Sequence, residues 1–114
     1  MQVKLEDKSG VSVVFVKGDI DINTSPDIKK FFDELIKDRK EKVVINLGDV
    51  SYVDSSGLAT FVEILKKLRS YGGKLKLTNL SSKVRGLFEI TKLTKLFDIF
   101  DEETAAIGSF QSGS

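Results

Sequence analysis

Three short apolar runs, separated by segments with helical spacing, limit the possible fold more than any other feature of the chain. The runs at 11–16 (VSVVFV), 42–47 (KVVINL) and 74–78 (KLKLT) have the β-branched or alternating character of strands. Strands connected through helices need right-handed crossovers and therefore lie parallel in one sheet. The sequence thus predicts an α/β fold with a mainly parallel central sheet of four to five strands, flanked by about four helices.

A further strand is predicted at the start of the chain. Residues 2–7 alternate between polar and apolar side chains, and the letters KSG that follow favour a turn into the run at 11–16. Two strands joined by so short a turn form an antiparallel hairpin. The parallel sheet is therefore expected to carry one antiparallel edge.

The helices are predicted from their capping residues and their apolar spacing. The first begins at Pro26 with Ser25 as its N-cap, and the second begins at about Ser56 and ends before the glycine pair at 72–73. A third is capped by Ser81 or Ser82, the segment 93–100 is apolar but ambiguous, and a last short helix covers 102–107. The apolar face of the first helix consists of Ile28, Phe31, Phe32, Leu35 and Ile36.

Length and composition indicate one globular domain. The chain has 114 residues, of which 40% are hydrophobic and 31% charged, and we expect one domain over 1–108 with a flexible tail over 109–114. No apolar run is long enough to span a membrane or to serve as a signal peptide, so a cytoplasmic location is expected. The net charge of +1 gives no reason to expect direct nucleic-acid binding.

The chain contains neither cysteine nor histidine. Thiol nucleophiles, disulfides, zinc sites built on these residues and imidazole acid–base catalysis are therefore excluded. A serine hydrolase triad of the usual kind cannot be assembled. We accordingly predict no catalytic residues, no metal site and no cofactor.

The most unusual local chemistry lies in the stretch VDSSGLA, at 53–59, where an apolar run meets a helical pattern. Asp54, Ser55 and Ser56 are all residues that favour a helix N-cap, and Gly57 eases a tight turn. The same junction is also suited to an anion, because a helix N-terminus offers free N–H groups at the carboxyl end of a parallel strand. The motif is neither a P-loop nor a nucleophile elbow, since the necessary lysine and first glycine are missing.

A second polar loop, GDID at 18–21, follows the run at 11–16. With right-handed crossovers it should lie beside the junction, so that Asp19 and Asp21 approach Asp54. Two interpretations stay open at this point: solvated carboxylates in a turn, or ligands for a hard cation such as Mg²⁺, although no fixed spacing supports the latter.

Three segments together resemble a known family. The stretches GDIDINTSPDIKKFFDELI, VVINLGDVSYVDSSGLATFV and GGKLKLTNLSSKVRGLFEITKLTKLFDIF are similar in content and spacing to the bacterial anti-sigma factor antagonists. These are single-domain members of the STAS group, which also includes the cytoplasmic domains of sulfate transporters. The resemblance extends from about residue 11 to residue 100.

The resemblance implies a partner-switching function without catalysis by the chain itself. Such an antagonist binds an anti-sigma factor, which is a serine kinase, and thereby frees a sigma factor. Phosphorylation by that kinase abolishes binding, and a serine phosphatase restores it. By position, Ser55 corresponds to the phosphorylation site, and Asp21, Asp54, Ser56 and Gly57 are expected at the partner-binding surface, with Ser56 as the helix cap.

Two alternatives remain on sequence grounds. The chain could be a STAS interaction subunit of another signalling or transport complex. It could also be a small hydrolase or nucleotide-binding enzyme that uses Ser55 with Asp54 or Asp21, although the absence of histidine and of a P-loop lysine argues against this.

Overall fold

The computed structural model describes residues 1–112, and five strands within them form one sheet. The elements in chain order are β1 (Gln2–Lys8), β2 (Val11–Lys17), α1 (Ser25–Lys37), β3 (Lys42–Asp49), α2 (Ser55–Arg69), β4 (Lys74–Thr78), α3 (Ser82–Ile90), a 3₁₀ turn (Leu93–Lys95), β5 (Asp98–Phe100) and α4 (Glu103–Ser112). The predicted α/β fold is thereby confirmed.

The strands lie in the sheet in their chain order, β1-β2-β3-β4-β5. β1 pairs antiparallel with β2, and each later strand pairs parallel with the one before it. The predicted antiparallel edge is therefore present. β5 lies within the segment that the sequence left ambiguous; it is only three residues long, too short to show a period of two.

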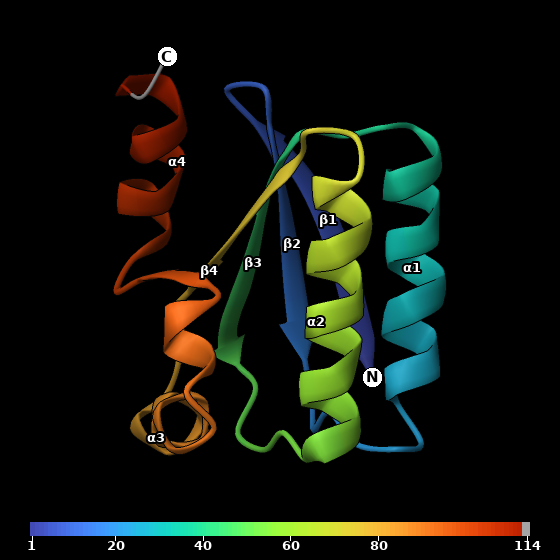
Figure 1. Cartoon of the computed structure of the whole chain (residues 1–114), viewed down its shortest axis with the longest axis vertical. Coiled ribbons are helices and arrows are strands. Elements are labelled where there is room, and N and C mark those ends of the chain that lie inside the picture. The colour runs from blue at the N-terminus through green and yellow to red at the C-terminus, as the bar shows by residue number, and fades with distance from the viewer. Residues whose placement is uncertain (113–114) are drawn as a thin grey trace.

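Helices cover both faces of the sheet and one of its ends (Figure 1). α1 and α2 lie side by side on one face, joined on their outer surfaces by an ion pair between Lys29 and Glu63 at 2.9 Å. α4 packs on β3, β4 and β5 from the opposite face. α3 lies at the carboxyl ends of the parallel strands, the same end at which α2 begins.

The main core lies between the sheet and the pair α1–α2. Phe32, Phe61 and Phe88 are its largest fully buried side chains. The Phe88 ring centroid lies 6.4 Å from that of Phe61 and 5.7 Å from that of Phe97, the latter in an edge-on arrangement. These contacts fix α3 and the turn before β5 to the core.

Two helix boundaries differ from the sequence predictions. Ser25 is not the N-cap of α1 but its first residue; Thr24 is the N-cap, and the Ser25 hydroxyl donates to the Asp21 carbonyl oxygen at 2.7 Å. Residues 109–112 of the expected flexible tail belong to α4, whereas 113–114 lie outside the described residues. For α3, the two candidate caps are resolved in favour of Ser81, whose hydroxyl accepts from the Val84 N–H.

No helix within residues 1–112 combines the length and the apolar character needed to cross a bilayer.

Candidate functional site

Ser55 is the first residue of α2 and lies at the carboxyl end of the sheet, after the loop 50–54. Its side chain is exposed, and within residues 1–112 its hydroxyl has no hydrogen-bond partner. It also lies in the first turn of a 15-residue helix, where the backbone N–H groups favour negative charge. A phosphate on Ser55 would therefore be accessible and electrostatically tolerated by its own helix.

Asp54, and not Ser56, caps α2. The Asp54 backbone is extended (φ −100°, ψ −174°), and its carboxylate accepts a hydrogen bond from the Gly57 N–H at 3.0 Å. The capping role expected for Ser56 is thus wrong, because the helix already includes Ser56, whose carbonyl accepts from the Thr60 hydroxyl. The carboxylate of Asp54, beside Ser55, therefore stabilises the N-terminus of α2.

Gly57 allows the start of α2 to pack closely on the neighbouring loop. A Cβ atom at this position would lie 2.7 Å from Ile20 Cγ2 and 2.8 Å from Val53 Cγ1. Gly57 is buried, and the partner-binding role expected for it from the sequence stays a prediction. Its observed role is one of packing.

We expect Gly57→Ala to destabilise the fold by about 1–3 kcal/mol, the usual cost of overpacking a tight site. Gly86→Ala provides a matched control in α3, where an added Cβ would meet nothing within 4 Å. This control should be neutral or stabilising, because alanine is the better helix former. Urea unfolding of both variants measures the difference. Equal stability of Gly57→Ala and the wild type would contradict the packing described.

Two loops that the sequence placed side by side are indeed joined by their backbones. The Ile20 N–H donates to the Tyr52 carbonyl at 2.9 Å, and the Asp54 N–H donates to the Ile20 carbonyl at 3.0 Å. A hydrogen bond from the Ser51 hydroxyl to Asp19 adds a side-chain link. The position of Ser55 is therefore set by two loops and not by one.

Asp21 shapes the first of these loops. Its carboxylate accepts hydrogen bonds from the N–H groups of Asn23 at 2.8 Å and Thr24 at 3.1 Å, and its side chain is only partly exposed. Among residues 1–112, no three acidic side chains come together in a way that could hold a metal ion. The structure thus gives no support to the cation interpretation of the acidic residues.

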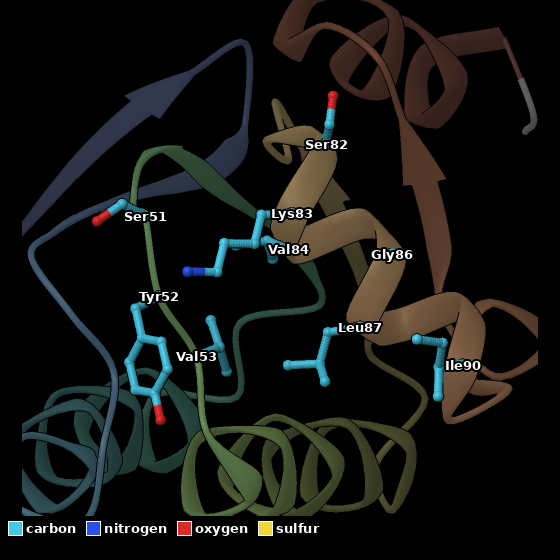
Figure 2. A pocket seen from close by; sticks show the side chains of 9 residues that line it. All are labelled: Ser51, Tyr52, Val53, Ser82, Lys83, Val84, Gly86, Leu87 and Ile90. Atoms are coloured by element: carbon cyan, nitrogen blue, oxygen red, sulfur yellow. The ribbon is translucent and has the colours of Figure 1, made fainter.

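An apolar groove lies beside the loop that leads to Ser55, and it was not predicted from the sequence. It has a volume of about 310 Å³ and runs between the loop at 51–53 and α3. In Figure 2, Val53 and Leu87 face the hollow from opposite sides, and Lys83 extends toward Tyr52. The Lys83 ammonium lies 5.8 Å from the centre of the Tyr52 ring.

Large apolar side chains are exposed around this groove. Ile90, on its rim, is 82% exposed, and Tyr52 is 44% exposed. Ile22, in the loop that contains Asp21, is 71% exposed. Within the described residues, only Met1 and Leu5 are further large apolar side chains of this kind, so exposure of apolar surface is concentrated at the end of the molecule that carries Ser55.

Comparison with known proteins gives consistent results for sequence and structure. The STAS domain family model matches residues 2–106. The chain is 37% identical over 105 residues to an anti-sigma-B factor antagonist of Listeria monocytogenes, covering 90% of each chain. It is 30% identical over 108 residues to an anti-sigma F factor antagonist of Paenibacillus polymyxa, covering 94% of this chain and 92% of the relative.

A solved structure shows the same fold. An anti-sigma factor antagonist from Mycobacterium paratuberculosis superimposes with a TM-score of 0.89 at 27% sequence identity. The match covers 97% of this chain and 94% of the other.

Proposed function

Because the chain belongs to the STAS domain family, among its anti-sigma factor antagonists, we propose that it acts as a phosphorylation-controlled binding switch centred on Ser55. In the unphosphorylated form it binds an anti-sigma factor in the cytoplasm and so frees a sigma factor. The anti-sigma factor is the kinase that phosphorylates Ser55, and a serine phosphatase reverses the modification. The chain itself catalyses no reaction.

The observation that carries this proposal is the position of Ser55 at the end of the sheet where large apolar side chains are exposed. The Ser55 hydroxyl, which has no hydrogen-bond partner within residues 1–112, is accessible to a kinase at the start of α2, and Tyr52 and Ile90, which line the groove next to the loop 51–53, offer apolar area to a partner. Apolar side chains gathered on one surface commonly mark protein-binding sites. Modification and binding would thus take place on the same end of the molecule.

Electrostatics explain how a phosphate could control binding without unfolding the protein. A phosphoserine carries a charge of about −1.5 to −2 at neutral pH. The N-terminus of α2 stabilises a negative charge placed there by about 0.3–1 kcal/mol. At an interface, by contrast, a new charge facing like charge or apolar surface can cost several kcal/mol, and each 1.4 kcal/mol lowers affinity tenfold. The switch would therefore act on the partner and leave the fold intact.

The carboxylates near Ser55 support a role in regulation over one in hydrolysis. Asp54 is occupied by the Gly57 N–H, and Asp21 by the N–H groups of its own loop. Neither side chain is hydrogen-bonded to the Ser55 hydroxyl as a general base would be.

Binding to a kinase-type anti-sigma factor encoded in the same genome tests the proposal. We expect the unphosphorylated protein to bind in calorimetric titration, and Ile90→Asp to weaken the affinity at least about tenfold, since a carboxylate would enter apolar contact. Leu5→Asp is the control, because Leu5 is 44% exposed but lies on β1, away from the groove. Equal affinities of the two variants would contradict the assigned surface.

A pull-down from the source cell separates the proposal from its alternative. Recovery of another signalling protein or a transporter, with no anti-sigma factor, would favour a STAS subunit of a different complex. Recovery of an anti-sigma factor would support the switch.

A further inference from the structure

α4 packs on its face of the sheet through few buried apolar side chains. Ala106 is the one fully buried hydrophobic residue in the described part of this helix, and it packs on Val11, Val13 and Val44. Ile107 and Phe110 are partly buried against the same cluster. α2, on the other face, buries five hydrophobic side chains, those of Leu58, Phe61, Ile64, Leu65 and Leu68. Apolar burial therefore holds α4 much more weakly than it holds α2.

Polar contacts hold the first turn of α4. The Glu103 carboxylate accepts hydrogen bonds from Lys8 Nζ of β1 at 2.5 Å and from Asn46 Nδ2 of β3 at 2.9 Å. Only 15% of the Glu103 side chain is exposed. Burial by itself would raise the pKa of Glu103, but these hydrogen bonds outweigh it and hold the pKa below its usual value.

A second polar contact holds the other end of the helix. Lys76 of β4 is 8% exposed, and its ammonium lies 4.0 Å from the centre of the Phe110 ring and 5.5 Å from that of Phe100. It also donates to the Ser109 hydroxyl. In the described part of the chain no carboxylate forms an ion pair with it, so that aromatic faces and a hydroxyl replace one.

The helix itself contributes little intrinsic stability. Its sequence, ETAAIGSFQS, contains Gly108 and two serines, all of which form helices less readily than alanine. A Cβ atom added at Gly108 would meet nothing within 4 Å, so the packing of the fold does not require glycine there. Gln111 adds a further polar contact, since its side-chain amide donates to the Ser9 carbonyl at 2.9 Å. α4 thus depends on its contacts with the strands and their connecting turn more than on its intrinsic helix propensity.

We propose that α4 is held on the sheet mainly by polar contacts and opens as a unit while the rest of the fold stays intact. Opening breaks the contacts of Glu103, Lys76 and Gln111 and uncovers an apolar strip of the sheet formed by Val11, Val13 and Val44. No strand pairing is lost, because α4 follows β5 at the edge of the sheet. Local opening of this kind is typical of elements with few buried apolar contacts. The inference does not depend on the function proposed for Ser55.

Hydrogen exchange of single amides, followed by NMR on the full chain, tests the inference. In the wild type, amides of α4 should exchange at least about 100-fold faster than the slowest amides of α2. Phe110→Ala removes one of the two aromatic rings beside the Lys76 ammonium. It should accelerate hydrogen exchange of the α4 amides about a further tenfold and leave exchange of the α2 amides unchanged. Gly108→Ala should slow α4 by about two- to fivefold, because alanine stabilises the helical state.

A control variant reverses the pattern. Phe31 is partly buried against the main core, so Phe31→Ala should accelerate the slowest amides of α2 and leave those of α4 unchanged. Equal exchange of α4 and α2 in the wild type would overturn the inference. So would a Phe110→Ala variant in which both helices are accelerated to the same extent, since α4 would then open only by global unfolding.

Discussion

Replacement of Ser55 by alanine is expected to reduce phosphate transfer from a partner serine kinase to background. Ser55 is exposed at the start of α2, and its hydroxyl has no hydrogen-bond partner within residues 1–112. The two nearest serines are less suited, because Ser51 is bonded to Asp19 and Ser56 is half-buried in the helix. Intact-mass measurement after incubation with kinase and ATP should show one added phosphate on the wild type and none on Ser55→Ala.

Ser56→Ala is the matched control. Since Asp54 provides the side-chain cap of α2, neither serine substitution removes that hydrogen bond, and both variants should unfold at about the same urea concentration. Ser56→Ala should accept phosphate at the wild-type level. Ser55→Ala should still bind the partner that the unphosphorylated wild-type protein binds. Phosphorylation of Ser55→Ala, or its loss in Ser56→Ala, would move the site away from Ser55.

The order of strands and helices could be predicted because each of the longer elements has its own pattern. β2, β3 and β4 are β-branched or alternating, and α1 has a continuous apolar face that includes Ile28, Phe32 and Leu35. β5 could not be predicted in this way, since its three residues become a strand only by pairing with β4. The register of this pairing, with Leu77 opposite Ile99, is set by tertiary structure and not by the local sequence.

The cap of α2 shows why local preference alone was insufficient. Asp54, Ser55 and Ser56 are all good N-cap residues, and their order in the sequence does not separate them. The structure selects Asp54 because its N–H is bonded to the Ile20 carbonyl, which keeps this residue extended and starts the helix after it. The deciding contact comes from a loop more than thirty residues earlier in the chain.

The groove between the loop 51–53 and α3 and the length of α4 could not be predicted, for a related reason. Ile90 looks like one more apolar residue of α3, and only the placement of that helix leaves it exposed at 82%. Likewise, the letters GSFQ at 108–111 suggest a tail, whereas Phe110 is positioned by the ammonium of Lys76. In both cases the sequence contains the residues but not the neighbours that give them a role.

Phe88→Ala is expected to cost about 3–5 kcal/mol of the free energy of unfolding, the largest stability effect among these variants. The Phe88 side chain is fully buried, and its ring contacts those of Phe61 and Phe97. Alanine would leave a cavity between α3, α2 and the turn before β5. Urea unfolding measures the loss, and Ile90→Ala is the control in the same helix, where surface exposure predicts a change within about 0.5 kcal/mol.

The same pair of variants separates support of the groove from contact with a partner. Phe88 holds α3 against the core from its inner side, whereas Ile90 lies on the rim of the groove. Ile90→Ala should therefore lower partner affinity without lowering stability, because it removes contact area only. Phe88→Ala should lower both, even in conditions where the protein remains folded, because α3 loses the anchor that positions the groove. A Phe88→Ala variant that costs less than about 1 kcal/mol would show that α3 is not fixed to the core in this way.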